Sequence, residues 1–556
     1  MKIAIAQINP TVGDLTGNTA RHLDFIRRAR NAGANLVVFP ELSITGYPPK
    51  DLLLKPGFID DNIAAVNAVA REARDIEVIA GFADRNADPI GRPARNSVAV
   101  LKNGKITSTH YKTLLPTYDV FDESRYFEPG PISSRNQLVQ ISNLKIGLSI
   151  CEDLWNDERL ITRRLYHQNP IADLDAAGAE VMINCSASPF VVDKHDFRLR
   201  LFSEQARKFN NPLIYANQVG GNDELVFDGN SCVFDQTGAV IAQAKDFEED
   251  LLVVNLPPNA GVEPATTRPE KPRATGLESI YRALVLGLRD YVRKCNFKTA
   301  VLGLSGGIDS ALVCALAVHA IGKDKVVGIA MPSRFSSDHS LNDARALATN
   351  LGIEFQTVPI ASVHDAYESL LNPYFAGRPP DITEENLQAR VRGAILMAFS
   401  NKFGHLLLTT ANKSESAVGY STLYGDMCGG LAVIQDVPKT TVWELSKWIN
   451  GYHNREIIPQ SSIEKVPSAE LRPNQTDQDS LPPYEVLDEI IERYVEREMG
   501  AAAIVDDGFN PALVSRVIRL IDRSEYKRRQ AAPGLKVTSR AFGFGRRMPI
   551  AQNYHP

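Results

Sequence analysis

The sequence predicts two α/β units in succession, a layered α/β sandwich followed by a doubly wound parallel sheet. The chain has 556 residues, which is long for one ordinary domain. A proline-rich stretch at 256–276 predicts an extended linker, because proline lacks the backbone N–H that helices and sheets use. Short β-rich runs alternate with helical stretches on both sides of it. We therefore expect domains at 1–255 and 277–556.

In the first domain, six runs rich in apolar and β-branched residues predict strands, at 2–7, 36–39, 78–83, 97–101, 146–150 and 181–185. The segment 16–33 predicts an amphipathic helix, since it begins with polar residues suited to a helix cap and stops near Gly33. Together these elements favour a layered sandwich over a barrel or a helical bundle.

Three local patterns in this domain carry reactive side chains: FPELSITGYPP around Glu41, HYKTLLPTYDVFDESRYF around Lys112 and LSICEDLW around Cys151. Glu41 and Cys151 follow predicted strands directly, so we expect both at strand ends facing a cleft. A thiol is mostly protonated near neutral pH, so a nucleophilic cysteine needs a base or a cation beside it. Taken singly, each residue also fits an ordinary role: a buried cysteine, an exposed lysine or a glutamate that caps a helix.

The three patterns together resemble those of the nitrilase superfamily over residues 1 to about 255. The resemblance implies an αββα sandwich that hydrolyses a carbon–nitrogen bond. It also implies Glu41 as general base, Lys112 as stabiliser of the oxyanion and thiolate, and Cys151 as the nucleophile. Glu123 matches the superfamily's second glutamate, which orients the lysine.

The same resemblance implies a glutamine site. Tyr118, Ser188 and Lys194 match positions that hold glutamine, although some relatives have arginine where this chain has Lys194. An ammonium can hold a carboxylate but lacks the two-pronged geometry of a guanidinium. Cys185 and Cys232 are expected to be structural.

In the second domain, apolar runs at 300–304, 325–333 and 354–360 predict strands, with helices at 311–322 and 341–352 between them. This strand–helix alternation predicts a doubly wound parallel sheet, whose ligands bind at the carboxyl ends of the strands.

The turn GLSGGIDS at 303–310 joins the first of these strands to its helix. Glycines let the backbone approach phosphate oxygens, and a helix N-terminus offers free N–H groups. The turn lacks the Gly-Lys-Ser/Thr ending of a Walker A loop, which argues against γ-phosphoryl transfer. It resembles the pyrophosphatase-type loop of ATP-dependent adenylating amide synthetases.

Further segments of this domain, NLQARVRG (386–393), 407–430, DVPKT (436–440), PSAEL (467–471) and YKRRQ (526–530), resemble the NAD synthetase family from about 280 onward. The resemblance implies Mg²⁺ on Asp309 and Glu415, since carboxylates suit this hard ion. It implies ATP as co-substrate and contacts to ATP from Gly303, Leu304, Ser305, Gly306, Gly307, Ile308, Asp309, Ser310, Arg390, Thr410 and Lys439. It implies contacts to the dinucleotide from Asn386, Glu415 and Lys527. Leu423 departs from the ammonia-using members, which have lysine there.

The two halves together resemble the glutamine-dependent NAD synthetases. That resemblance implies ATP-dependent amidation of deamido-NAD⁺ to NAD⁺ through an adenylated intermediate, with ammonia from glutamine and release of AMP, pyrophosphate and glutamate. It also implies a homo-oligomer, at least a dimer through the synthetase domain. Another glutamine-dependent adenylating amidotransferase with a different acceptor stays open. A non-catalytic nucleotide-sensing scaffold is disfavoured, because every expected reactive residue is present.

Composition limits the partners further. The 61 basic and 66 acidic residues give a net charge of −5, which argues against nucleic acid as the main partner. Six cysteines are too few for a disulfide scaffold in a chain of this length, and the absence of a CxxC pair or a neighbouring His cluster argues against a structural zinc or iron–sulfur site. No run approaches the roughly 18 apolar residues of a membrane span, and no signal peptide is recognisable. We expect a cytoplasmic enzyme without a membrane partner.

Overall fold

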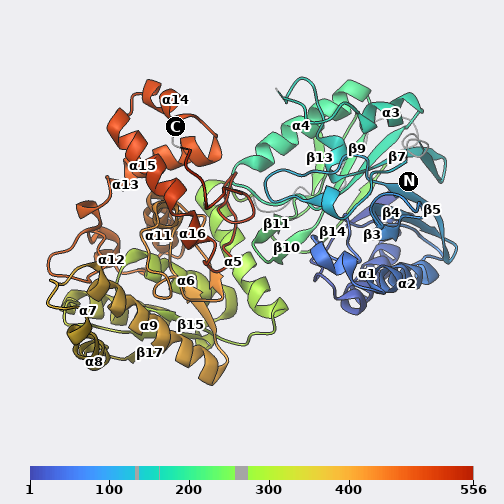
Figure 1. Cartoon of the computed structure of the whole chain (residues 1–556). Coiled ribbons are helices and arrows are strands. Elements are labelled where there is room, and N and C mark those ends of the chain that lie inside the picture. The colour runs from blue at the N-terminus through green and yellow to red at the C-terminus, as the bar shows by residue number, and fades with distance from the viewer. Residues whose placement is uncertain (132–136, 162, 257–272, 555–556) are drawn as a thin grey trace. The chain divides into compact units, whose positions relative to one another are not determined.

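The computed structural model describes residues 1–131, 137–161, 163–256 and 273–554. Most of the predicted linker at 256–276 therefore lies outside the described residues. The chain separates into two compact units, Met1–Thr275 and Gly276–Pro556 (Figure 1), which we call the first unit and the second unit.

The first unit contains two six-stranded sheets. One has the order β14-β1-β2-β3-β4-β5 and the other β13-β12-β9-β8-β7-β6. The strands of the first sheet are β1 (Lys2–Gln7), β2 (Leu36–Val38), β3 (Glu77–Arg85), β4 (Ala94–Lys102), β5 (Lys105–Tyr111) and β14 (Asp250–Asn255). Those of the second are β6 (Leu138–Ile141), β7 (Leu144–Ile150), β8 (Val181–Ser186), β9 (Leu213–Asn217), β12 (Cys232–Phe234) and β13 (Val240–Gln243). A separate hairpin pairs β10 (Val219–Asn222) with β11 (Leu225–Asp228).

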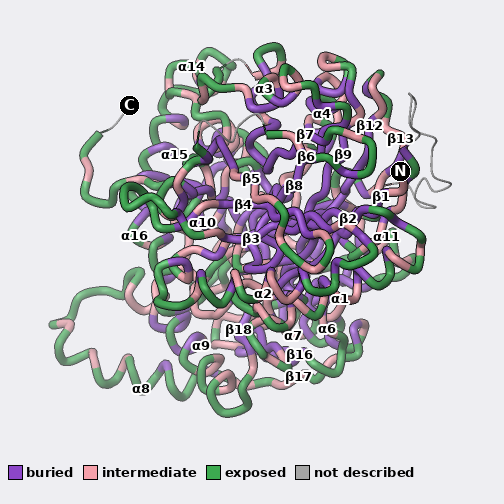
Figure 2. Tube along the Cα trace, turned by 90° about the vertical axis from the view of Figure 1, so that its right-hand side faces the viewer, coloured by how far each residue is buried: buried purple, intermediate pink, exposed green. Residues whose placement is uncertain are grey.

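The two sheets pack face to face, and helices cover their outer faces. Residues of both sheets, such as Ile5 and Ile183, share one buried core. The helices α1 (Leu15–Asn31) and α2 (Phe58–Glu72) pack on the first sheet. The helices α3 (Pro170–Ala176) and α4 (Lys194–Phe209) pack on the second. The predicted αββα sandwich is confirmed, and Figure 2 shows its sheets as largely buried.

The second unit has one five-stranded sheet of order β17-β16-β15-β18-β19, in which every neighbouring pair is parallel. Its strands are β15 (Ala300–Gly303), β16 (Val326–Ala330), β17 (Glu354–Thr357), β18 (Leu406–Thr409) and β19 (Leu431–Ala432). From β15 the chain adds β16 and then β17 on one side, and it later adds β18 and β19 on the other side. Because crossovers between parallel strands are right-handed, α6 and α7 lie on one face of the sheet and α9 lies on the other. The predicted doubly wound sheet is confirmed.

Helices and short turns complete this unit. They are α5 (Gly276–Lys294), α6 (Ile308–Ile321), α7 (Asp338–Leu351), α8 (Ala361–Leu371), η6 (Asn372–Tyr374), α9 (Ile382–Phe403), α10 (Lys413–Val418), α11 (Lys439–Tyr452), α12 (Gln460–Glu464), α13 (Tyr484–Ile491), α14 (Ala501–Asp506), α15 (Pro511–Arg523) and α16 (Glu525–Arg528). The helix α6 begins three residues earlier than predicted, because the end of the glycine-rich turn forms its first turn. Asp309 and Ser310 are therefore helical. No helix among the described residues has the length and apolar character needed to cross a membrane.

Candidate active sites

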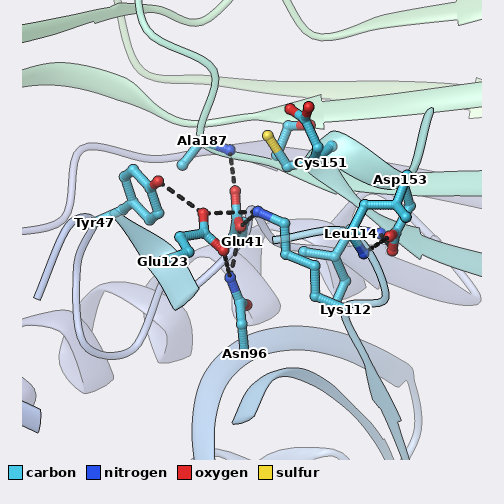
Figure 3. A network of polar contacts seen from close by, with 12 residues as sticks. Glu41, Tyr47, Asn96, Lys112, Leu114, Glu123, Cys151, Asp153 and Ala187 are labelled. Carbon is cyan, nitrogen blue, oxygen red and sulfur yellow. Dashed lines mark hydrogen bonds and ion pairs between the residues drawn. The ribbon is translucent and has the colours of Figure 1, made fainter. Parts of the chain in front are cut away.

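The first unit places its reactive residues at strand ends. Glu41 lies three residues after β2, Lys112 directly after β5 and Cys151 directly after β7. Glu123 begins a short 3-10 turn, η2 (Glu123–Arg125). Figure 3 shows these four side chains close together, with polar contacts joining Lys112, Glu41 and Glu123 beside Cys151.

Lys112 is the centre of this network. Its Nζ donates to Glu41 Oε1 at 2.7 Å and to Glu123 Oε1 at 2.8 Å. The Lys112 side chain is completely buried. Burial by itself lowers the pKa of Lys112, but the carboxylates of Glu123 and Glu41 outweigh it and hold that pKa above its ordinary value. The lysine is therefore a fixed cation.

Three further groups position the two glutamates. Asn96 of β4 donates to Glu41 Oε1 at 2.7 Å, and the backbone N–H of Ala187 donates to Glu41 Oε2 at 2.9 Å. The Tyr47 hydroxyl donates to Glu123 Oε1 at 2.8 Å. Sequence reasoning missed all three. The one sequence signal for Tyr47 was its place in the GYPP run shortly after Glu41.

The backbone at Cys151 turns sharply between β7 and the 3-10 turn η4 (Cys151–Leu154), with φ at +42°. Asp153 holds this turn, since its carboxylate accepts from the backbone N–H groups of Ile150 at 3.0 Å and Leu114 at 2.8 Å. Burial raises the pKa of the Cys151 thiol, the Glu41 carboxylate adds to this, and the Lys112 ammonium opposes it. The resting thiol is thus neutral, and its attack on a substrate needs a base such as Glu41.

Two of the three predicted glutamine-binding residues, Tyr118 and Lys194, interact with a carboxylate that sequence reasoning missed. Tyr118 and Tyr166 donate their hydroxyls to the buried Glu152, at 3.0 and 3.1 Å respectively. Lys194 acts electrostatically on Glu152 and lies 5.0 Å from the Trp155 ring centre. The position of Glu152 next to Cys151 was the signal that could have found it.

Ser188 belongs to the same loop as Ala187, after β8. It is buried, and its backbone N–H donates to Asn217 Oδ1 at 2.9 Å.

The second unit has a cavity of about 290 Å³ at the carboxyl ends of its strands. Of the predicted ATP contacts, it is lined by Gly303, Leu304, Ser305, Gly307, Ile308, Asp309, Ser310, Thr410 and Lys439. Gly306 has φ at +78°, and its carbonyl accepts from Ser462 Oγ at 3.1 Å. The Cβ of any other residue there would lie 2.3 Å from the carbonyl oxygen of Ser340. Glycine is therefore required at this position.

Two carboxylates and a lysine meet inside this cavity. Lys439 Nζ donates to Asp309 Oδ2, and it donates to Glu415 Oε1 at 3.3 Å. Asn412 donates to Asp309 Oδ1 at 2.8 Å. Burial, with the neighbouring Asp309 carboxylate, raises the pKa of Glu415 to about 8. A cation bound beside this pair would favour the ionised form of Glu415.

Three predicted contacts lie elsewhere, around the segment 419–423. Asn386 Oδ1 accepts from the Thr422 hydroxyl at 2.7 Å. Arg390 is exposed and donates to the carbonyl of Leu423. Lys527 Nζ donates to the carbonyls of Gly419 and Ser421, each at 2.7 Å, and lines a small pocket beside that segment. Arg392, which sequence reasoning passed over, lines the main cavity.

Comparisons with known proteins match both units. The carbon–nitrogen hydrolase model matches residues 2–263, and the NAD synthase model matches residues 280–531. The glutamine-dependent NAD(+) synthetase of Synechocystis sp. is 48% identical over 100% of this chain and 99% of its own length. That of Thermotoga maritima is 44% identical over the same shares. The chain belongs to the glutamine-dependent NAD(+) synthetase family.

A solved structure of a member of this family agrees in fold. The glutamine-dependent NAD+ synthetase from Acinetobacter baumannii, in complex with adenosine diphosphate, is 40% identical with a TM-score of 0.78. The match covers 99% of this chain and 98% of that chain.

The acid pair of the second unit, Asp309 and Glu415, has the chemistry to bind a divalent cation. Asp309 and Glu415 both contact the Lys439 ammonium, and both line the cavity. Carboxylate oxygens are the ligands that Mg²⁺ prefers.

Proposed function

We propose that this chain converts deamido-NAD⁺ to NAD⁺, using ATP and ammonia released from glutamine. The observation that supports this best is that one chain carries both a buried Glu-Lys network beside Cys151 and a phosphate-loop cavity with paired acids. The first suits amide hydrolysis, and the second suits adenylation.

In the first unit, Cys151 Sγ attacks the side-chain amide carbon of glutamine while Glu41 accepts the thiol proton. Lys112 stabilises the negative charge that develops on the amide oxygen. Glu41 then donates the proton to the leaving nitrogen, so ammonia departs and a thioester remains. Water, deprotonated by Glu41, cleaves the thioester and releases glutamate.

The first unit also needs to hold the amino-acid end of glutamine. We assign the ammonium of glutamine to Glu152 and its carboxylate to Lys194, with Tyr118 and Ser188 in the walls. Glu152 supports this because it is a buried carboxylate directly beside the nucleophile. Glu152→Gln is expected to raise the KM for glutamine about tenfold or more while ammonia-driven synthesis persists.

In the second unit, a carboxylate oxygen of deamido-NAD⁺ attacks the α-phosphorus of ATP, and pyrophosphate leaves. Residues 303–310, Thr410 and Lys439 hold the phosphates, while Asn386 and Lys527 hold the dinucleotide. Mg²⁺ bound by Asp309 and Glu415 would neutralise charge on the phosphates. Ammonia then attacks the acyl carbon, and AMP departs with the two electrons of the broken C–O bond.

The decisive experiment measures NAD⁺ formation from deamido-NAD⁺, ATP and Mg²⁺ with either glutamine or ammonium chloride. Wild type should use both donors. Cys151→Ala should use only ammonium, and Asp309→Ala should use neither while still hydrolysing glutamine. Glutaminase activity without NAD⁺ under any condition would preserve the first unit's role and refute the acceptor.

We also propose a homodimer that forms through the second unit. Val363, Tyr367, Leu370 and Tyr374 are spaced by four, three and four residues along α8 and η6, and all are 42–81% exposed. Figure 2 shows α8 as largely exposed. A second copy of this chain would bury this stripe. Leu370→Glu should shift the mass measured by light scattering toward that of a monomer, whereas an unchanged dimer would exclude this face.

A further inference from the structure

The phosphate loop of the second unit contains no cation. GLSGGIDS offers glycine N–H groups, hydroxyls and the start of α6, but no lysine or arginine. A triphosphate carries several negative charges, so positive side chains must come from other segments. Three such side chains line the cavity among the described residues: Lys439, Lys465 and Arg392.

Both lysines are already paired with acids. Lys439 contacts the carboxylates of Asp309 and Glu415. Lys465 Nζ donates to Glu470 Oε1 at 2.8 Å. Without a ligand, these acids balance the charges of both lysines, and Mg²⁺ on Asp309 and Glu415 would release Lys439 toward phosphate.

Arg392 differs from the two lysines. Its Nε donates to the carbonyl of Met331 at 3.0 Å, at the end of β16. Within the described part of the chain, no carboxylate lies within 4.0 Å of its guanidinium, and its two terminal nitrogens have no hydrogen-bond partner. Burial lowers the pKa of Arg392 to about 10, with only distant help from Glu470 and Asp426. It is still charged at neutral pH, so an unbalanced cation faces the cavity.

The position of Arg392 in the fold indicates which ligand it can reach. A Cβ on Gly303 would lie 3.3 Å from Met331 Cε and 3.4 Å from Leu396 Cδ1. Met331 provides the carbonyl that fixes Arg392, and Leu396 lies one turn further along α9. The guanidinium is thus anchored beside the carboxyl end of β15, the strand that leads into the phosphate loop.

We propose that Arg392 binds a phosphate group of ATP and supplies the cation that the loop lacks. This rests on the proposed adenylation activity of the same cavity. The two terminal nitrogens can hold two phosphate oxygens at once, which a lysine cannot reproduce.

The test compares Arg392→Met, Arg392→Lys and wild type in the full-length enzyme, with Arg345→Met as control, since Arg345 is an exposed arginine of α7. Calorimetry measures the Kd for Mg-ATP, for adenosine and for deamido-NAD⁺, beside glutaminase activity and melting temperature. Arg392→Met should raise the Kd and KM for ATP roughly 10- to 100-fold and leave adenosine binding and glutaminase activity unchanged. Arg392→Lys should recover part of the loss. The melting temperature of the free enzyme should stay the same or rise, because an unbalanced, half-buried charge is removed.

Three results would overturn the proposal. Unchanged ATP affinity would show that Arg392 does not bind phosphate. Weaker deamido-NAD⁺ binding alone would assign the cation to the dinucleotide instead. An equal loss of ATP and adenosine affinity with a lower melting temperature would make Arg392 a structural support for β16. These measurements are binding constants, so they test the role of Arg392 even if the wild-type enzyme makes no NAD⁺. A wild-type enzyme that binds ATP but makes no NAD⁺ would refute the proposed function and leave the role of Arg392 testable.

Discussion

Each unit buries a lysine between two carboxylates, and one carboxyl of each pair has a raised pKa. Lys112 contacts its two acids at 2.7 and 2.8 Å, and Asn96 and Ala187 donate further hydrogen bonds to Glu41. Lys439 also contacts two acids, and burial raises the pKa of Glu123 in the first network to about 7 and that of Glu415 in the second to about 8. The acids of the second network line the cavity at the carboxyl ends of the strands, so a cation can reach them there.

Replacing Lys112 tests how far the first network depends on its charge. Lys112→Met leaves Glu41 and Glu123 buried without their cation, so we expect loss of glutaminase activity and about 3–5 kcal/mol of destabilisation. Adding Glu123→Gln should restore part of the stability but none of the activity, because the repulsion is relieved while the oxyanion remains unsupported.

Hydrogen exchange measured by mass spectrometry reports this stability locally. Peptides from 138–160 should exchange faster in Lys112→Met, and peptides from 300–330 serve as an internal reference. A double variant no more stable than Lys112→Met would show that carboxylate repulsion is not the source of the loss.

Glu123 makes the stability of the first unit depend on pH. Burial, partly offset by Lys112 and reinforced by Glu41, raises the pKa of Glu123 to about 7 from an ordinary 4.5. The folded state therefore keeps this proton at pH values where the unfolded state has lost it. The resulting stability is complete below pH 4.5 and disappears as the pH rises through about 7.

Exchange rates at several pH values, corrected for intrinsic chemistry, check this expectation. Glutamine at position 123 does not titrate, so wild type should lose stability relative to Glu123→Gln between pH 5 and pH 8. A difference that stays constant over this range would contradict a raised pKa.

At the scale of elements, strand ends place the reactive groups, and close backbone packing fixes them. Gly81 of β3 lies against the segment that carries Glu41: an added Cβ would be 2.3 Å from the Leu42 nitrogen and 2.4 Å from the Pro40 oxygen. The Gly81 carbonyl also accepts from the backbone N–H of Ile44 at 3.0 Å. The position of Glu41 thus depends on a glycine in a neighbouring strand.

We expect Gly81→Ala to lower glutaminase activity on the order of 100-fold, because small displacements of a catalytic group are costly. Synthesis with ammonium should persist. Gly104→Ala is the control for backbone strain, since Gly104 lies in the turn between β4 and β5 with φ at +80° and no atom within 4 Å of an added Cβ. Equal losses in both variants would assign the effect to general strain rather than to Glu41.

Sequence patterns predicted these elements well because periodicity and caps are local. The run at 2–7 is β1 itself, and Glu41 and Cys151 follow strands as expected. The donors from Asn96 and Ala187 could not be predicted, since they lie 55 and 146 residues from Glu41. Arg390 and Arg392 show the same limit. Two helical positions two residues apart point in nearly opposite directions, and only the packing of α9 decides which one meets the cavity.

At the scale of the whole molecule, the two chemistries occur in units with separate cores. Hydrolysis yields ammonia, which is mostly protonated in neutral water and then cannot attack an acyl group. A chain that combines both sites benefits only if ammonia reaches the adenylate before it equilibrates with solvent. Variants that each lack one activity can distinguish ammonia transfer within one chain from ammonia transfer through bulk solvent.

We expect wild type to form NAD⁺ from glutamine without a lag and to resist an ammonia scavenger, such as glutamate dehydrogenase with 2-oxoglutarate and NADPH. An equal mixture of Cys151→Ala and Asp309→Ala has both activities, but on different chains. It should form NAD⁺ only after a lag, while ammonia accumulates in solution, and the scavenger should abolish product. Cys151→Ala with ammonium chloride provides the control that the scavenger works. If the scavenger inhibits wild type as strongly as the mixture, ammonia passes through bulk solvent, and joining the units in one chain serves another purpose.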